Sequence, residues 1–438
     1  MSTVTGARRR PGTAARLGVP PLRGHGRFIT GNLIDSLGNG MLLPLGLLYF
    51  TDVRGLPAAQ VGMAMTVGQA VALPVTFLAG RLMDRTGPRT VVVAANVLSA
   101  VGFTLFLFAD RLWHVAVVHV VVQAGINMYF TAQRTLITYV TEPGERRAWF
   151  AFTGSLRNVG LAAGSAAAAG ALVVFGKGSL WWLIAVDAAT YLLAALCFAT
   201  LRTTPPGSPA TAVVSVVPVV PEPDGTPADK CATRAGHTRR YLLLVAVNLP
   251  YVLAQAALSV LVALYTTRAL GLPASAASVL FVVNTVIVSG CSTVITAHVA
   301  PKVPRRAVAA GYLVMAAGMG AFMLPAMAAM PAPPALAVTA WGALVAAIVL
   351  FSVAEILLGP ALSELSVSLT PDAAGGFTQG LYQFSWALGM VAAPALFTLL
   401  LEAGPLLPWG AEAVACLIAA AAAPALRTPT RHRRRKPR

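Results

Sequence analysis

Long apolar runs recur along almost the whole chain, and they constrain its fold more than any other feature. Each run is about 20 residues long, enough for a helix to cross a hydrocarbon core of about 30 Å. Of the 438 residues, 57% are hydrophobic and only 11% are charged, whereas a soluble domain carries about 25% charged residues. We therefore expect the lipid bilayer to be the solvent for most of the protein.

The apolar runs predict twelve membrane-spanning helices. Backbone polar groups in lipid must be hydrogen-bonded within their own segment, and the alternating pattern of a membrane β-barrel strand is not seen in the sequence. The predicted spans are 27–50, 58–80, 90–109, 113–138, 149–175, 180–201, 241–267, 275–298, 307–329, 335–362, 376–401 and 408–426. The predicted fold class is an all-α membrane protein.

The positive charges indicate which side of the membrane each loop occupies. With a cytoplasmic N-terminus, 27 of the 32 Lys and Arg residues fall in cytoplasmic segments and Arg157 falls within a span. Only Arg54, Arg111, Lys177 and Arg268 fall in outer loops. This distribution follows the positive-inside rule. We expect a multi-pass protein of a bacterial-type cytoplasmic membrane with both termini in the cytoplasm. The net charge of +17 then reflects topology and not a nucleic-acid partner.

A polar stretch divides the chain into two halves. Residues 203–238 are rich in Pro, Ser and Thr, which is typical of a mobile linker. The predicted parts are a basic cytoplasmic N-terminus (1–26), a six-helix bundle (27–201), a cytoplasmic linker (202–240), a second six-helix bundle (241–427) and a basic cytoplasmic tail (428–438). The tail is expected to contact the anionic inner leaflet. No apolar core of a removable signal peptide occurs in the first part.

The two halves resemble each other in sequence. Tyr49–Ala58 reads YFTDVRGLPA and Tyr265–Ala274 reads YTTRALGLPA, a shift of 216 residues. The same shift aligns Asn32 with Asn248. Two halves repeated in the same orientation predict pseudo-symmetric bundles, related by an axis along the membrane normal.

Polar side chains mark one face of several predicted helices. Asn32, Asp35 and Asn39 lie at positions i, i+3 and i+7 and therefore share a face of the first helix. Polar groups at membrane depth face protein or water, so these helices are expected to line an aqueous cleft between the halves. The alternative is that they form hydrogen bonds that only hold the bundle together. The predicted substrate cavity contains Asn32, Asn39, Asn127, Asn158, Asn248, Tyr251, Gln255, Gln383 and Trp386.

The connection between the second and third spans reads GRLMDRTGPR from Gly80 to Arg89. A glycine, an acid–base pair, a second glycine and a basic residue resemble the signature loop of the major facilitator superfamily. The topology, the central linker and the duplication extend this resemblance to the whole chain. It implies a secondary transporter that works by alternating access, with a cytoplasmic gate motif at Gly80, Asp84, Arg85, Gly87 and Arg89.

The residue types of this motif suit a gate. Gly80 and Gly87 allow a tight turn, and Asp84 can complement the N-terminus of a neighbouring helix or pair with a basic residue. In the second half, Ala300 stands where Asp84 would map. The gate is therefore predicted to be asymmetric.

The ionisable residues considered to lie clearly inside predicted spans are Asp35, Arg157, Asp187 and Glu355. Each costs about 2.5–3.5 kcal/mol or more at the centre of a span, so each needs a partner or a function. Glu355 precedes Pro360 in a pattern similar to that of some drug/proton antiporters of the superfamily. A low-dielectric cleft favours the neutral form of a carboxyl group, which makes Glu355 a candidate proton carrier.

Arg157 keeps its proton, so we expect it to pair with Asp35 or Glu355 and to couple proton and substrate binding. The alternative is a static buried ion pair. Asp187 and His119 are expected to be structural.

These features favour a transporter of the twelve-helix drug/proton antiporter type. It would export a small amphiphilic or drug-like molecule (multidrug efflux) in exchange for protons. Proton-coupled or facilitative uptake of a polar nutrient is the alternative, although such a site is expected to need more amides or several arginines. Residues Gly160–Ser165 lack the proline of the motif found in many efflux antiporters. The expected partners are the substrate, protons and lipid, and we expect a monomer.

An enzyme is not expected. The sequence contains no phosphate-binding loop, nucleophile elbow or metal-ligand cluster. The predicted energy source is therefore the proton gradient, with no cofactor and no metal.

Overall fold

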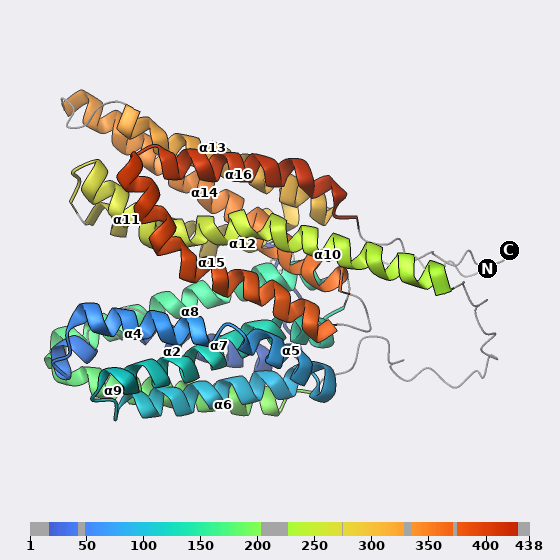
Figure 1. Cartoon of the computed structure of the whole chain (residues 1–438), viewed down its shortest axis with the longest axis horizontal. Helices are drawn as coiled ribbons and strands as arrows, with labels where there is room; N and C mark the ends of the chain where they lie inside the picture. The colour runs from blue at the N-terminus through green and yellow to red at the C-terminus, as the bar shows by residue number, and fades with distance from the viewer. Residues whose placement is uncertain are drawn as a thin grey trace, which may run out of the picture.

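Two bundles of long helices lie side by side (Figure 1). The computed structural model describes residues 17–42, 49–142, 144–202, 227–273, 275–327, 334–370 and 375–427. Within these ranges there is no β-strand, and eleven helices are long and apolar enough to cross a membrane. Helix α2 (Gly26–Leu42) occupies most of the first predicted span, so the structure agrees with the predicted twelve helices.

Each bundle has its own core of buried apolar side chains. The first bundle contains α2, the π-helix η1 (Tyr49–Val53), α4 (Ala58–Val71), α5 (Val75–Thr86), α6 (Pro88–Phe106), α7 (Leu112–Val140), α8 (Arg146–Phe175), the short turn η2 (Gly176–Gly178) and α9 (Ser179–Ala199). The second bundle contains α10 (Pro227–Ala256), η3 (Ala257–Leu261), α11 (Val262–Leu264), η4 (Tyr265–Ala269), α12 (Ser275–His298), α13 (Pro304–Met327), α14 (Pro334–Ser368), α15 (Gly375–Ala403), α16 (Leu407–Ala422) and η5 (Ala423–Ala425).

The helices differ from the predicted spans in two places. The span predicted at 58–80 is divided into α4 and α5 at Pro74, which has no backbone N–H to donate. The segment 202–240, predicted as a linker, ends in helix because α10 begins at Pro227. Residues 1–16, 203–226 and 428–438 lie outside the described part of the chain.

The connection Gly80–Arg89 identifies one side of the molecule. On that side Arg27 Nη1 donates a hydrogen bond to the carbonyl oxygen of Thr200 (2.8 Å), and Arg89 Nη1 donates one to that of Leu201 (2.9 Å). The start of α2, the end of α5 and the end of α9 therefore lie together. We call this end the loop side, and the other end the opposite side.

The sequence repeat appears again as a repeat of local structure. η1 and η4 are both π-helical, and each is followed by a glycine of positive φ, Gly55 (69°) and Gly271 (63°). The hydroxyl of Tyr49 donates to the carbonyl oxygen of Leu107 (3.2 Å). In the second bundle the matching residue is Tyr265, and its hydroxyl likewise donates to the carbonyl oxygen of Phe322 (2.6 Å). The two bundles are therefore structural copies at this point.

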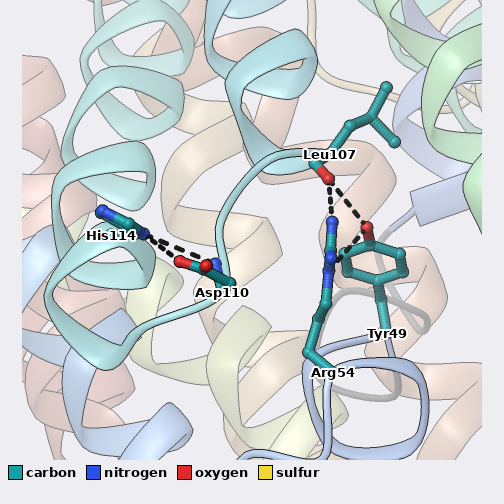
Figure 2. A network of polar contacts seen from close by, with 5 residues as sticks. All are labelled: Tyr49, Arg54, Leu107, Asp110 and His114. Atoms are coloured by element: carbon teal, nitrogen blue, oxygen red, sulfur yellow. Dashed lines mark hydrogen bonds and ion pairs between the residues drawn. The ribbon is translucent and has the colours of Figure 1, made fainter.

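One copy carries an additional contact, shown in Figure 2. Arg54 Nε donates a hydrogen bond to the hydroxyl of Tyr49 (3.2 Å), and Arg54 Nη2 donates to the carbonyl oxygen of Leu107. Close by, His114 Nδ1 lies 2.7 Å from Asp110 Oδ1. The contacts of Tyr49 and Arg54 fasten the end of the first span to the end of α6 on the opposite side, whereas the pair of His114 and Asp110 lies within the turn between α6 and α7.

Replacing Gly55 by alanine is expected to destabilise the fold by about 1–2 kcal/mol, because a Cβ atom is strained at positive φ. No atom lies within 4 Å of the added Cβ, so the cost comes from the backbone alone. Thermal unfolding of the purified protein in detergent would measure it. Gly62→Ala is the control, because this helical glycine also has open space around it and should lose no stability. Equal melting temperatures for the two variants would contradict the prediction.

Candidate functional site

The two bundles are in close contact on the loop side, where α15 packs against α5 (Figure 1). A Cβ atom on Gly80 would overlap the carbonyl oxygen of Gly376. Likewise, a Cβ atom on Gly376 would overlap the carbonyl oxygen of Gly80. A Cβ on Gly380 would lie 2.6 Å from the carbonyl oxygen of Thr76. Because the obstructing atoms belong to the backbone, only glycine permits this approach. We call Gly80, Gly376 and Gly380 the glycine seam.

This arrangement corrects one prediction for the gate motif. Gly80 and Gly87 are both predicted to form a turn, but Gly80 lies inside α5, which continues to Thr86. Only Gly87 has a positive φ, 82°. The intervening residues include good helix formers such as Arg81 and Leu82, so the helix does not end at Gly80. Gly80 allows close contact between helices instead of a turn.

Asp84 joins the two bundles directly. Its Oδ1 atom accepts a hydrogen bond from the backbone N–H of Gly376 at 2.6 Å. α15 begins at Gly375, so this N–H belongs to the first turn and has no partner within the helix. A carboxylate there also complements the helix dipole. Arg85 is exposed and Arg89 contacts its own bundle, and among the described residues no contact of either with α15 is found.

Replacing Asp84 by asparagine is expected to slow transport several-fold. The amide keeps an acceptor but loses the charge, which weakens the hydrogen bond to Gly376 by about 1 kcal/mol. The measurement is the initial transport rate at matched expression. Asp110→Asn is the control, since Asp110 is an exposed carboxylate on the opposite side. A normal rate in Asp84→Asn would exclude a role for this charge in closing the loop side.

Arg147, on α8, adds a second junction on the loop side. Its Nη1 atom donates a hydrogen bond to the carbonyl oxygen of Pro301 at 2.5 Å. Its Nε atom lies 3.9 Å from Glu364 Oε2 of α14. Sequence reasoning assigned Arg147 to membrane topology only, because its position near a span end matched the positive-inside rule.

Arg134, on α7, forms a third junction and is buried, with 9% of its surface exposed. Its Nε and Nη2 atoms donate hydrogen bonds to Gln379 Oε1 (3.3 Å) and Gln383 Oε1 (3.0 Å) of α15. The guanidinium also lies over the ring of Tyr382, 4.6 Å from its centroid. Sequence reasoning counted Arg134 among the cytoplasmic charges as well. The contacts of Asp84, Arg134, Arg147 and the seam join the two bundles on the loop side in this structure.

A cavity of about 520 Å³ lies between the bundles. Its polar and charged lining consists of Gln69, Gln123, Asn127, Gln133, Arg134, Thr153, Arg157, Asn158, Tyr251, Gln255, Ser259, Ser292, Glu355, Ser363, Tyr382, Gln383 and Trp386. The rings of Tyr251 and Trp386 meet edge to face, with centroids 5.6 Å apart. Of the nine predicted cavity residues, Asn127, Asn158, Tyr251, Gln255, Gln383 and Trp386 are in this lining. Its seven amides and two arginines make it more polar than predicted.

The three other predicted cavity residues lie elsewhere. Asn32 Oδ1 accepts hydrogen bonds from the hydroxyl of Tyr129 (3.0 Å) and from Gln133 Nε2 (2.5 Å), and Asn39 Oδ1 accepts one from Tyr191 (3.0 Å). The polar face of α2 therefore packs against α7 and α9 within its own bundle. Asn248 is fully buried between the hydroxyls of Tyr382 (2.8 Å) and Ser385 (3.1 Å) on α15. Helical spacing showed which residues share a face but not which neighbour that face meets.

Asp35 lines a separate cavity of about 10 Å³, which is close to the volume that one water molecule needs. Asn39, Asn96, Tyr129 and Tyr191 give this cavity a polar wall. Its remaining lining residues are Ser99, Ile126 and Phe130. Ile126 and Phe130 also line the large cavity, so they form the wall between the two spaces.

Arg157 stands at this wall. Its guanidinium lies 4.6 Å from the ring centroid of Phe130, on the side of the large cavity. Among the described residues it forms no ion pair within 4.0 Å with Asp35 or Glu355, which differs from the predicted pairing. The aromatic ring provides a cation–π contact in place of a carboxylate.

Glu355 lines the large cavity from α14. Asn284 Nδ2 of α12 donates to Glu355 Oε2 (3.1 Å) and to Ser352 Oγ (3.0 Å). Gln255 Nε2 is buried and has no hydrogen-bond partner in the described part of the structure. Asn284 was missed by sequence reasoning, although a single amide in an apolar helix was a detectable signal.

Asp187 and His119 line neither cavity. Asp187 is fully buried against Gly38 of α2, and Thr190 Oγ1 lies 3.5 Å from its Oδ1. His119 Nε2 lies 3.3 Å from Gln123 Nε2 one turn along α7.

Two pseudo-symmetric helical bundles with a polar cavity between them define a multi-pass membrane transporter. A family model described as "Major Facilitator Superfamily" matches residues 28–333. The chain belongs to the major facilitator superfamily, a family of transporters and not of enzymes.

Known proteins with sequence similarity match only part of the chain. An uncharacterised MFS-type transporter, YhjO of Bacillus subtilis, is 28% identical over 170 residues, which are 38% of this chain and 41% of YhjO. The multidrug resistance protein MdtH of Yersinia enterocolitica is 29% identical over 115 residues, which are 26% and 29% of the two chains. The match thus spans less than half the length of these relatives.

Solved structures match over the whole fold. The human organic anion transporter MFSD10 (TETRAN) gives a TM-score of 0.64 at 16% identity, covering 94% of this chain and 100% of that one. The fucose:proton symporter FucP of E. coli gives 0.65 at 14% identity, covering 92% and 98%. At these identities the likeness concerns the fold.

Proposed function

We propose that the protein exports a small amphiphilic molecule across the cytoplasmic membrane in exchange for protons, with both termini in the cytoplasm. The observation that carries this proposal is the position of Glu355, a carboxyl group in the wall of the cavity between the bundles. Its hydrogen bond of 3.1 Å comes from a neutral amide, Asn284. A carboxyl held by a neutral donor can gain or lose a proton without breaking an ion pair. The partial similarity to MdtH also supports export.

Proton and substrate exchange would take place inside the large cavity. Glu355 holds the proton, and the edge-to-face pair of Tyr251 and Trp386 provides an apolar surface for the substrate. Arg157 carries a permanent charge beside the wall that separates Asp35 from Glu355. A turn of Phe130 would allow this guanidinium to approach Asp35. Asp35 and Arg157 are therefore the proposed coupling partners of Glu355.

Alternating access then requires the loop side to open. The hydrogen bond from Gly376 to Asp84 and the contacts of Arg147 with Pro301 and Glu364 would have to break. The glycine seam would separate at the same time. These contacts belong to the state that is closed towards the cytoplasm.

Everted membrane vesicles test the export proposal. Respiration acidifies their interior, and candidate lipophilic cations, carboxylates, neutral antibiotics and sugars are added outside. A compound exchanged for protons should dissipate the pH gradient in vesicles that contain the protein and not in vesicles without it. If no drug-like compound does so, and a polar compound carries protons into right-side-out vesicles, export is excluded and uptake is established.

Uptake of a polar molecule together with protons is the second candidate. The observation that favours it is the lining of the cavity, where Arg134 and Arg157 stand among seven amide side chains. Sugar and organic-anion sites need such groups, because each buried polar group of the ligand requires a partner. The same vesicle experiments separate the two candidates, because substrate and proton move in opposite directions in export and in the same direction in uptake.

A further inference from the structure

We propose that Arg134 binds the carboxylate or another anionic group of the transported molecule, so that the substrate is an amphiphile with one anionic end. The inference rests on the proposed function only in taking the large cavity as the substrate site. It holds for transport in either direction.

The first argument is the absence of a counter-ion beside a buried charge. Arg134 is 9% exposed and lines the large cavity. Within the described residues no carboxylate lies within 4.0 Å of it, and its hydrogen bonds go to the neutral amides of Gln379 and Gln383. A guanidinium does not lose its charge, and a buried charge without a counter-ion is costly. A ligand anion would supply the missing charge.

The second argument is that donors remain for a ligand. A guanidinium has five N–H groups, and the hydrogen bonds to the two glutamines use one on Nε and one on Nη2. The ring of Tyr382 covers one face of the guanidinium, with its centroid 4.6 Å away. The remaining N–H groups match the two oxygens of a carboxylate in geometry.

The third argument is that the side chain is held in place without being neutralised. Gln379 Nε2 donates to the carbonyl oxygen of Ser366 (2.8 Å) and to Thr370 Oγ1 (3.1 Å), which turns its Oε1 atom towards Arg134. The hydroxyl of Tyr382 is held by Asn248 Oδ1 (2.8 Å). A binding group supported by a second layer of hydrogen bonds loses little entropy when the ligand arrives.

The charges of the cavity agree with this assignment. The charged residues in its lining are Arg134, Arg157 and Glu355, two cations and one carboxylate. Asp35 lies behind Ile126 and Phe130 in the small cavity. One monoanion would therefore neutralise the large cavity when Glu355 is ionised. A cationic ligand would leave the cavity further from neutrality.

The competing explanation is that Arg134 only joins α7 to α15. The two roles differ in their dependence on ligand charge. A purely structural arginine would affect all ligands of one shape equally when it is replaced, whereas an anion-binding arginine would affect only the anionic ligand.

The test uses three probes of similar shape: naphthalene-1-carboxylate, its methyl ester and naphthalen-1-ylmethylammonium. Binding to the full chain is measured by titration calorimetry in nanodiscs of zwitterionic lipid, with empty nanodiscs subtracted. We expect the carboxylate to bind about tenfold or more tightly than either other probe. Arg134→Gln should remove this difference. Arg240→Gln, which removes an exposed charge at the start of the seventh span, should keep it.

Tighter binding of the ammonium, or equal binding of all three probes to the wild type, would overturn the proposal, and neither result depends on a variant. Equal weakening of all probes by Arg134→Gln would also overturn it and would leave Arg134 a structural role. If that variant does not fold, Arg134→Lys keeps the charge and loses the paired donors, and it should retain only part of the preference. Since no proton gradient is present, a failure of proton-driven export would leave this result unchanged.

Discussion

Replacing Gly376 by alanine is expected to reduce the transport rate about 5- to 150-fold. The added Cβ would overlap the backbone of Gly80, and neither helix can yield by rotating a side chain. α5 and α15 would have to separate until the contact reaches the ordinary 3.4–4 Å. Forcing an extra carbon into a packed interface costs about 1–3 kcal/mol. This energy shifts the equilibrium between the two states away from the closed loop side by about 5- to 150-fold.

The neighbouring glycine provides a matched control for this prediction. A Cβ on Gly375 would lie 3.7 Å from its nearest atoms, so Gly375→Ala should transport normally. A cysteine at Ser363, in the cavity lining, reports the conformation in a background without the native cysteines. A membrane-impermeant maleimide applied from the loop side should label it faster in Gly376→Ala than in Gly375→Ala. Equal labelling and equal transport would show that the seam does not control access.

Replacing Glu355 by glutamine is expected to abolish proton-driven transport while exchange of substrate for substrate continues. The amide has the same shape and can still accept the hydrogen bond from Asn284, but it cannot carry a proton. The measurement compares two assays in the same vesicles: accumulation driven by a pH gradient, and counterflow of labelled against unlabelled substrate. Accumulation should fall at least tenfold, and counterflow should remain close to the wild-type rate.

The second assay distinguishes loss of coupling from loss of folding. A misfolded variant would lose both activities, whereas an uncoupled transporter keeps counterflow. Glu402→Gln is the matched control, because Glu402 is an exposed glutamate on α15 outside the cavity lining. Normal accumulation by Glu355→Gln would remove Glu355 from the proton pathway and would direct attention to Asp35.

Hydropathy was sufficient to predict the fold, because the bilayer requires each crossing segment to be apolar and helical. The repeated Tyr49–Ala58 and Tyr265–Ala274 segments also predicted matching structure, and both contain a π-helix and a buried tyrosine. The division of the second span at Pro74 was not predicted, although proline was a visible signal. A hydropathy scale scores only how apolar each residue is, so it does not show that Pro74 lacks a backbone N–H donor.

The cavity was predicted in part. Residues on α8, α14 and α15 such as Arg157, Glu355 and Gln383 were assigned to it from polarity at membrane depth, and they lie in its lining. Asn32 and Asn39 were assigned to it by the same reasoning, but α2 turns them towards its own bundle. Arg134 was missed because a charge near the end of a span is explained equally well by topology. The rotation of each helix about its axis depends on how it packs against its neighbours. The spacing of residues along one helix does not give this information.

The glycine seam has a consequence for how temperature affects the transporter. Glycine has no side chain to immobilise, whereas ordering a long side chain costs up to about 2 kcal/mol in entropy. Closure between Gly80 and Gly376 therefore adds little to the entropy difference between the two states. Where both states are comparably populated, the enthalpy difference nearly equals the temperature times the entropy difference, so the contribution of the seam to the enthalpy difference is small as well. The seam therefore adds little to the change of the equilibrium on warming or cooling, and that change depends mainly on the contacts made by long side chains such as Arg147.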